Sequence, residues 1–527
     1  AASADPGALR IDCAAGARPI SPMIYGVAFD FMRDARDAYV WRMRPGARRW
    51  GGNPASRFNW RDGHAWNMAS DWYFRNVNYT GRDAFSYRDF LDSNRVRGVA
   101  TSLTVPMLDW VAAADSGHSF SVRLDGAQQY ADPDVPDAGN GVAADGSLIR
   151  VPPERASVPS SPGSVGAWAA AIRARRDSGG WGRDVQTYIL DNEPMLWNST
   201  HRDVHPEPVS YDELLERTIR YGTAIRRADP GALIAGPAAW GWPGYFFSAV
   251  DAQRGFWLRP DRLRHGNVPL LPWYLRRLRE HERRTGVRVL DVVDVHFYPM
   301  GAGVGGDDGA RDPETAARRI RATRALWDST YVDESWIDEP VRLIPRLREW
   351  IAREYPGRGI SIGEWSFGAP THMSGGLAAA EALGRFGQLG LHSAFYWTYP
   401  PEDSPAFHAF RAFRDYDGRG AAFLDWSVPT RAAPGLSLFA SRDSAATRLV
   451  AVLLNPDPER AAVARVDHAS CGTAAGRRLF TYAGAAGGLR PDSSVAATGA
   501  AFGVTLPPYS INVVEITLAR RAGAPRG

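Results

Sequence analysis

The sequence contains no lysine, so all 62 of its lysine-plus-arginine residues are arginine. This absence excludes enzymes that form a Schiff base on lysine and proteins that use the lysine of a phosphate-binding P-loop. No apolar run reaches the roughly 18 residues that span a membrane, so no membrane partner is expected. No stretch interleaves arginine with aromatic residues either, so the net charge of +4 predicts solubility and no nucleic-acid partner.

Cysteine is nearly absent, since Cys13 and Cys471 are the only two. Two cysteines so far apart exclude cysteine metal clusters and CxxC redox sites. Two alternatives stay open, a single disulfide in an exported protein or two buried free thiols, because the sequence does not determine their separation in space. Residues Ala1–Asp5 carry no charged and then apolar leader, which is typical of a mature form after removal of an export signal, and we expect a secreted, extracellular protein.

Hydrophobic and aromatic residues are plentiful. The 527 residues are 44% hydrophobic, which is enough for one large core and a smaller domain. There are 19 tryptophans and 19 tyrosines, and flat aromatic faces are surfaces on which sugar rings stack. Core packing must nevertheless account for most of them, because large aromatic side chains dominate protein cores.

Eight short buried runs bounded by turn residues predict β-strands, at 24–30, 48–53, 99–107, 185–194, 233–239, 292–299, 359–367 and 393–399. Amphipathic helical patterns lie between several of them, at 211–228, 269–284, 341–355 and 376–389. This alternation favours an α/β fold, and specifically a (β/α)8 TIM-like barrel over a doubly wound sheet.

After Trp426 the pattern changes to short alternating runs, which predict a C-terminal β-sandwich domain. The opening run 9–13 also alternates and is expected to return as an extra strand of that sandwich. We therefore predict an N-terminal strand segment at 1–18, a catalytic barrel at 19–426 and a β-sandwich at 427–527. A long loop at 112–167, rich in Asp, Gly, Pro and Ser, is expected to form one wall of a cleft.

Two of the predicted strands end in glutamate, within Asp191-Asn192-Glu193-Pro194 and Ile362-Gly363-Glu364-Trp365. The carboxyl ends of parallel strands meet at one mouth of a barrel, so we expect the two carboxylates to face each other. Two carboxyl groups about 5–5.5 Å apart hydrolyse a glycosidic bond with retention, through a covalent glycosyl-enzyme. We predict Glu193 as the acid/base and Glu364 as the nucleophile, although an isolated strand-end glutamate is more often an ion-paired surface group.

Polar side chains beside these glutamates are candidate substrate-binding or positioning groups. Asn192 is placed to donate to a sugar 2-hydroxyl, and Tyr298 to donate its phenolic hydrogen to Glu364. For His296, an active-site role and an ordinary hydrogen-bonded strand-end histidine both stay open.

Several tryptophans lie near predicted strand ends. Those predicted to line a sugar-binding cleft are Trp60, Trp72, Trp336 and Trp397, whereas those predicted to pack within the fold are Trp110, Trp327 and Trp365.

Several sequence motifs, found in order along the chain from about Pro19 onward, resemble those of glycoside hydrolase family 44. They include Arg49-Trp50-Gly51-Gly52-Asn53, Asp71-Trp72-Tyr73-Phe74, Asp191-Asn192-Glu193-Pro194, His296-Phe297-Tyr298-Pro299 and Gly363-Glu364-Trp365. The resemblance implies a retaining endo-β-1,4-glucanase, in a family where many members act on xyloglucan. Glu193 and Glu364 match the family's acid/base and nucleophile on strands four and seven, and Asn53 joins the predicted substrate-binding residues. We expect a monomer with a β-glucan polysaccharide partner and no catalytic cofactor.

The resemblance is weakest in Tyr25–Asp30, where an asparagine is expected soon after Gly26, so subsite contacts there stay open. Members of this family can carry a structural calcium ion. The loop with Asp307 and Asp308 is a candidate site for it, although a solvated turn is the simpler interpretation and no residue is assigned as a metal ligand.

Two other functions stay open. A catalytically silent carbohydrate-binding protein is one, but such a protein has no reason to keep two like charges close together. A sister glycosidase with a barrel and a sandwich, such as a xylanase or an arabinofuranosidase, is the other. The GxGxxG pattern at 301–306 does not indicate a dinucleotide site, because an acidic turn and not a helix follows it.

Overall fold

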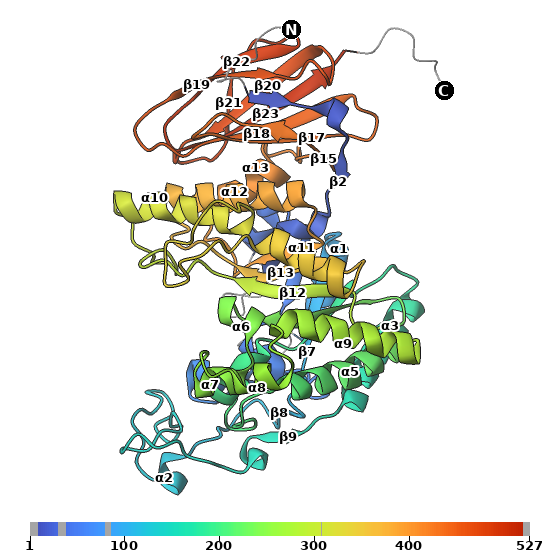
Figure 1. The fold of residues 1–527 in the computed structure, drawn as a ribbon, viewed down its shortest axis with the longest axis vertical. Coiled ribbons are helices and arrows are strands. Elements are labelled where there is room, and N and C mark those ends of the chain that lie inside the picture. The colour runs from blue at the N-terminus through green and yellow to red at the C-terminus, as the bar shows by residue number, and fades with distance from the viewer. Residues whose placement is uncertain (1–8, 30–37, 79–85, 307, 520–527) are drawn as a thin grey trace.

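The computed structural model of this protein describes residues 9–29, 38–78, 86–306 and 308–519. It contains a closed eight-stranded barrel and a β-sandwich (Figure 1). The predicted α/β barrel with a C-terminal sandwich is therefore confirmed. No helix within these described ranges is long and apolar enough to cross a membrane.

All neighbouring strands of the barrel pair in parallel, and the last strand closes on the first. Each of the eight runs predicted from the sequence overlaps one barrel strand. In chain order the strands are β3 (Gly26–Ala28), β4 (Ala47–Trp50), β7 (Ala100–Val105), β10 (Thr187–Leu190), β11 (Leu233–Ala239), β12 (Val292–Phe297), β13 (Gly359–Trp365) and β14 (Ser393–Tyr396).

Helices follow most of these strands and surround the barrel: α1 (Tyr87–Val96), α3 (Pro162–Gly179), α5 (Tyr211–Ala228), α9 (Leu270–Thr285), α10 (Pro313–Ala322), α11 (Leu343–Glu354), α12 (Met373–Leu389) and α13 (Pro405–Arg414). Helix α5 has the predicted bounds because Ser210 caps it, accepting a hydrogen bond from the N–H of Glu213. Between β3 and β4 the described residues include the 3₁₀ helix η3 (Ala38–Met43).

The fourth barrel strand is shorter than the predicted run 185–194, and Glu193 is among the residues that lie outside it. Strand β10 ends at Leu190 because Asp191 and Glu193 adopt positive φ angles of 63° and 45°, which strands do not allow. Glu193 therefore lies in the turn that begins the 3₁₀ helix η7 (Pro194–Leu196). Asn53 likewise lies beyond β4, at the start of η4 (Asn53–Arg57).

The sandwich has two sheets. One has the order β16 (Thr430–Arg431), β1 (Leu9–Ile11), β19 (Ala462–Asp467) and β22 (Ala501–Leu506). The other has the order β2 (Arg18–Pro19), β15 (Trp426–Val428), β17 (Ser437–Arg442), β18 (Arg448–Asn455), β23 (Ser510–Leu518), β20 (Ala474–Tyr482) and β21 (Arg490–Asp492). The N-terminal segment thus supplies one strand to each sheet, and a disulfide joins Cys13 to Cys471.

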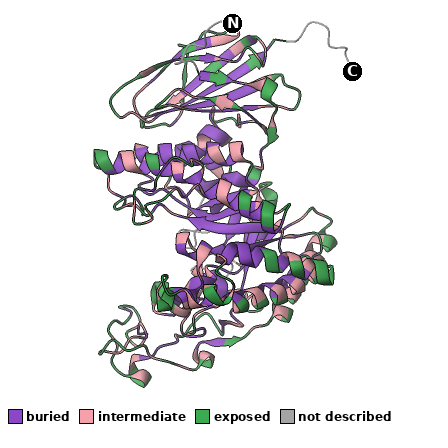
Figure 2. Ribbon diagram, in the orientation of Figure 1, coloured by how far each residue is buried: buried purple, intermediate pink, exposed green. Residues whose placement is uncertain are grey.

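Two apolar cores hold these parts together. One fills the space between the barrel and its helices, and the other, which includes Leu9 and Ile11, lies between the two sheets of the sandwich. Helix α12 contacts β17, β18 and β23, so the sandwich sits directly on the barrel's helical shell (Figure 2). The sandwich therefore packs against the side of the barrel that α12 covers, and the long loop lies on the opposite side (Figure 1).

The loop after β8 (Trp110–Ala112) is built from short pieces that include α2 (Val122–Asp125) and β9 (Ser157–Pro159). It projects from the barrel on the side away from the sandwich (Figure 1). Its Asp132 is buried and accepts hydrogen bonds from the Trp72 indole at 2.8 Å and from the Arg75 guanidinium at 2.7 Å. The loop therefore anchors Trp72, one of the predicted cleft residues.

Candidate active site

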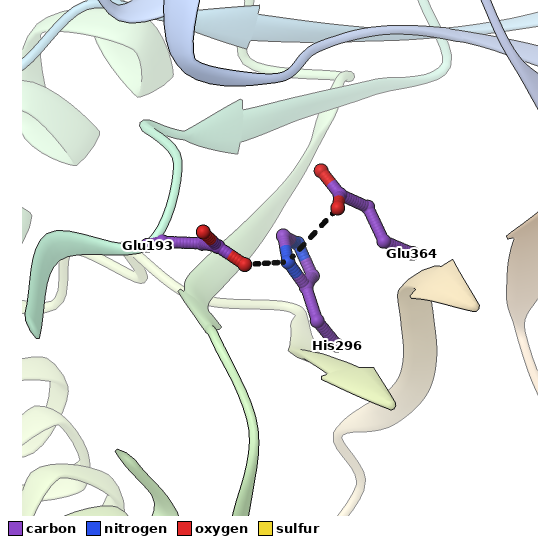
Figure 3. Close-up of side chains that lie close together, drawn as sticks. All are labelled: Glu193, His296 and Glu364. Atoms are coloured by element: carbon purple, nitrogen blue, oxygen red, sulfur yellow. Dashed lines mark hydrogen bonds and ion pairs between the residues drawn. The ribbon is translucent and has the colours of Figure 1, made fainter. Parts of the chain in front are cut away.

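Two glutamates from distant parts of the chain meet at the carboxyl ends of the barrel strands (Figure 3). His296 of β12 lies between them, with Nδ1 2.8 Å from Glu193 Oε1 and 3.5 Å from Glu364 Oε2. One nitrogen or oxygen atom of each of these three side chains lies within 4.8 Å of the others. This spacing fits a retaining pair, since inverting carboxyl groups lie about 6.5–9.5 Å apart to admit a water molecule.

A buried aspartate holds the turn that carries Glu193. The Asp191 carboxylate accepts hydrogen bonds from Ser56 Oγ at 2.5 Å and from the N–H of Asn192 at 2.7 Å. Burial raises the pKa of Asp191 to about 6, against the effect of these hydrogen bonds. The N–H of Glu193 itself donates to the carbonyl of Ala238 in β11, at 3.1 Å. The turn is thus tied to two neighbouring parts of the barrel mouth.

Arg49 of β4 is fully buried and positions the second glutamate. Its Nη1 donates to Glu364 Oε1 at 2.6 Å and to the carbonyl of Gly363 at 3.1 Å, and its Nη2 donates to Asn192 Oδ1 at 2.8 Å. Tyr298 donates its hydroxyl to Glu364 Oε2 at 2.9 Å, as predicted. Both oxygens of the carboxylate therefore accept hydrogen bonds, which favour its ionised form.

The surroundings move the pKa values of the two glutamates in opposite directions. Burial raises the pKa of Glu364, but the positive charges of His296 and Arg49 and the hydrogen bonds from Arg49 and Tyr298 outweigh it, so this pKa lies below its ordinary value. Burial raises the pKa of Glu193, and the charge of Glu364 adds to it, against the hydrogen bond from His296. Two carboxyls whose pKa values are separated in this way divide into an acid and a nucleophile.

His296 contacts both glutamates and so lies in this site, as the first of the two alternatives left open for it requires. Burial lowers the pKa of the imidazole, but the Glu364 and Glu193 carboxylates outweigh burial and raise it. The ring is fully buried, and its backbone carbonyl accepts a hydrogen bond from the Tyr245 hydroxyl. A positively charged ring held between the two carboxylates reduces the repulsion between them.

A chain of hydrogen bonds leads from the groups around Glu364 to the surface. Asn192, which Arg49 holds through its Oδ1, donates Nδ2 to Asn53 Oδ1 at 3.0 Å. Asn53 in turn donates to both oxygens of Asp71, at 3.1 and 3.0 Å. Burial raises the pKa of Asp71, as does the negative charge of Glu364, against the hydrogen bond from Asn53. Asn53 and Asn192 therefore lie in the site, joined to a third carboxylate, that of Asp71.

Two of the four predicted cleft tryptophans lie beside this chain. Trp72 follows Asp71 directly and is 42% exposed. Trp397 follows β14, and its ring lies against Gly52, where a Cβ atom would come within 2.6 Å of it. Gly52 has a φ of +85°, so the glycine before Asn53 is required both by its backbone and by the tryptophan ring.

The other two lie elsewhere. Trp60 stacks on Trp168 of α3 with ring centroids 6.5 Å apart, and its Nε1 donates to Ser164 at 3.3 Å. The structure thus packs Trp60 against α3, and no contact among the described residues links it to Glu193 or Glu364. Trp336 is 59% exposed, and no contact among the described residues links it to Glu193 or Glu364.

Two residues of the site, Arg49 and Asp71, were not assigned from the sequence. A signal existed for Arg49, because a buried strand with two consecutive arginines must turn one of them into the barrel, where a charge needs a partner. No comparable signal marks Asp71, since an acidic residue in a polar turn is ordinary.

Glu193, His296 and Glu364 form the one group of three or more potential metal ligands found within the described ranges. Calcium prefers sets of six to eight oxygen atoms, which this group does not offer. The loop predicted to hold calcium includes Asp307, which lies outside the described residues, so the structural calcium ion stays a prediction.

The chain is similar to known glycoside hydrolases and glucanases. The model of glycoside hydrolase family 44 matches residues 65–301. The chain is 37% identical to endoglucanase A of Paenibacillus lautus over 247 residues, which cover 45% of this chain and 34% of that protein. It spans about a third of the length of the curated relatives it matches.

Among the solved structures that match over almost the whole chain, two are of particular interest. The crystal structure of CelM2, a bifunctional glucanase-xylanase from a metagenome library, has a TM-score of 0.89 and 34% identity, covering 97% of this chain and 99% of that one. A family 44 xyloglucanase of Paenibacillus polymyxa, solved with xyloglucan, has a TM-score of 0.79 and 26% identity, again covering 97% and 99%.

Proposed function

The chain belongs to glycoside hydrolase family 44, and from this premise we propose that it is a retaining, endo-acting glycoside hydrolase that cleaves β-1,4-glucan backbones. The observation that carries the proposal is the close pair of carboxyls, Glu193 and Glu364, whose pKa values the surroundings separate. Cellulose derivatives, mixed-linkage glucan and xyloglucan are the proposed substrate class.

The reaction follows from the protonation states of the two glutamates. The ionised Glu364 attacks the anomeric carbon while Glu193 transfers its proton to the departing glycosidic oxygen, so the bond to that oxygen breaks as the glycosyl-enzyme ester forms. Glu193, now ionised, then removes a proton from a water molecule that attacks the same carbon and releases Glu364. No step needs a cofactor.

His296 and Arg49 serve this cycle by their charge. When Glu364 becomes an ester it loses its negative charge, and the Glu193 carboxylate that remains is 2.8 Å from the imidazole. The pKa of Glu193 therefore falls as the intermediate forms, because its repulsive neighbour is gone. This change converts the same residue from an acid into a base.

The names of similar proteins support the substrate class. They include an endoglucanase of Paenibacillus lautus, a glucanase-xylanase and a xyloglucanase bound to xyloglucan. The Cys13–Cys471 disulfide supports the proposal that this protein acts outside the cell, where disulfides persist. The family match does not favour a non-catalytic binding protein, a xylanase alone or an arabinofuranosidase.

A substrate panel tests the proposal. We expect the full chain to release mixed oligosaccharides from xyloglucan, mixed-linkage glucan or hydroxyethylcellulose early in the reaction, whereas an exo-acting enzyme would release one small product. The Glu364→Gln variant should lose turnover and keep polymer binding. Glu515→Gln is a matched control, because Glu515 also accepts hydrogen bonds from a tyrosine and an arginine but lies in the sandwich. Turnover by Glu364→Gln would contradict the assignment of the nucleophile.

A further inference from the structure

A groove of about 1670 Å³ lies between the barrel and the sandwich, and none of the residues of the catalytic site lines it. Its barrel wall comes from α10, α12 and the 3₁₀ helix η8 (Thr323–Leu326), and its other wall from the N-terminal segment and the sandwich. Figure 1 shows α10 and α12 beside the sandwich sheets. Small-molecule sites are about 300–1000 Å³, so this groove has room for an extended, polymeric ligand.

The lining of the groove is strongly basic. Two acidic side chains, Glu381 and Asp467, line it, against seven arginines: Arg10, Arg18, Arg321, Arg324, Arg385, Arg431 and Arg465. A concave surface lined mainly by one sign of charge concentrates ligands of the opposite sign.

The sandwich wall carries three of these arginines on adjacent strands. Arg10 of β1 lies directly opposite Arg431 of β16. On its other side Arg10 lies opposite Asp467 of β19, and Arg465 precedes Asp467 by two residues on that strand. The alternation of strands therefore puts all four side chains on one face of the sheet. Like charges opposite each other on neighbouring strands destabilise a sheet, and this row of three arginines contains a single carboxylate, that of Asp467.

The charge in this row is poorly neutralised within the protein. Arg431 and Arg465 are exposed, and neither forms an ion pair or side-chain hydrogen bond with any of the residues that the structure describes. Arg10 has only a 3.8 Å contact to Asp12. The donors of these guanidinium groups are therefore free to bind a ligand.

The barrel wall holds its arginines in place. Arg385 donates to Glu381 at 2.7 Å, and its guanidinium lies 4.0 Å from the centre of the Trp327 ring. Arg324 donates to Asp328 at 2.9 Å. These contacts orient the arginines before any ligand arrives, which lowers the entropy cost of binding.

We propose that this groove is a second carbohydrate-binding site, which takes an acidic polysaccharide through the carboxylates of its uronic acid units. The planar guanidinium fork matches a carboxylate with two parallel hydrogen bonds. The choice of a polysaccharide rests on the proposed function, since an enzyme that cleaves glycans meets acidic glycans beside its neutral substrate. Single-stranded nucleic acid fits less well, because its bases need exposed aromatic rings for stacking. Trp327 is the one aromatic side chain found in the lining, and Arg385 covers a face of its ring.

The test measures binding of polygalacturonate to the full chain by titration calorimetry at low salt. This polymer is no β-1,4-glucan, so the catalytic site should not bind it. The double variant Arg431→Gln/Arg465→Gln should bind about tenfold more weakly, since it removes two exposed charge contacts, which are strongest at low salt. The control is Arg254→Gln/Arg264→Gln, two exposed arginines at the ends of α7 (Ala249–Arg254) and α8 (Pro260–Arg264) that line no part of the groove. It should change binding less than twofold.

Three results would overturn the proposal: no binding by the unaltered protein, equal weakening in both double variants, or single-stranded DNA binding as tightly with the same dependence on Arg431 and Arg465. Hydrolysis of xyloglucan, measured on the same preparations, should be equal in all of them. If the unaltered protein did not hydrolyse xyloglucan, this would count against the proposed function. The polygalacturonate titration would still test the groove independently.

Discussion

The hydroxyl of Tyr298 offers a direct test of how the nucleophile is kept ionised. Tyr298→Phe removes one O–H group that donates to Glu364 Oε2 at 2.9 Å and leaves the ring in place. Arg49 and His296 remain, so the carboxylate keeps its two positive neighbours. The variant isolates the contribution of a single hydrogen bond to the pKa of the nucleophile.

The expected size follows from the energy of that hydrogen bond. A hydrogen bond to a charged group contributes about 1.5–3 kcal/mol, and one pKa unit corresponds to about 1.36 kcal/mol. The hydroxyl stabilises the ionised carboxylate and so lowers its pKa; removing it raises the pKa by about 1–2 units. The nucleophile is inactive when protonated, so activity is lost on the acid side of the profile first.

The assay is the pH dependence of kcat/KM on a soluble glucan, which reports the ionisations of the free enzyme. The acid limb should move to higher pH in Tyr298→Phe, while the activity at alkaline pH is less affected. Tyr274→Phe is the control, because Tyr274 is also fully buried and hydrogen-bonded, to Thr218 at 2.9 Å, but lies outside the site. An unmoved acid limb in a folded Tyr298→Phe variant would refute the reasoning.

Three further predictions follow from the same geometry. Glu193→Gln should lower turnover of polymers by about 10²–10⁴-fold but spare aryl glycosides with good leaving groups, and equal loss on both would speak against the acid role. Asp71→Asn should move the acid limb of kcat/KM to lower pH, opposite to Tyr298→Phe, because it removes a negative charge near the nucleophile; a shift upward would contradict this. Gly52→Ala should raise KM, because the added Cβ displaces the ring of Trp397. The control is Gly63→Ala, where φ is +86° and the surrounding space is open, so the substitution should cost only backbone strain of about 1–3 kcal/mol. Equal KM values in the two variants would disprove the contact between Gly52 and Trp397.

Several parts of the site could be predicted from local sequence. The hydrogen bond from Tyr298 to Glu364 was expected, since both residues lie at the ends of consecutive barrel strands. Asn53 and Asn192 lie in the site, but their hydrogen bonds to each other and to Asp71 were not foreseen. Such bonds depend on the turns after β4 and β10, whose positive φ angles have no simple signature in the sequence.

Other parts depended on longer-range packing. Trp60 was predicted to line the cleft, and the structure stacks it on Trp168 of α3. Nothing in its neighbourhood distinguishes an aromatic residue that faces a ligand from one that faces a helix. The arginine-lined groove could not be predicted from the sequence either, because Arg10, Arg385 and Arg465 lie far apart in the chain.

The sequence by itself determined the eight strands, the limits of helix α5 and the two-part architecture, because burial periodicity, caps and turn residues act over a few neighbouring positions. Tertiary structure alone decided that Arg49 and His296 separate the pKa values of Glu193 and Glu364, and that arginines from three segments line one groove. The physical reason is that electrostatic energies depend on distances and burial, and these exist only once the barrel has closed.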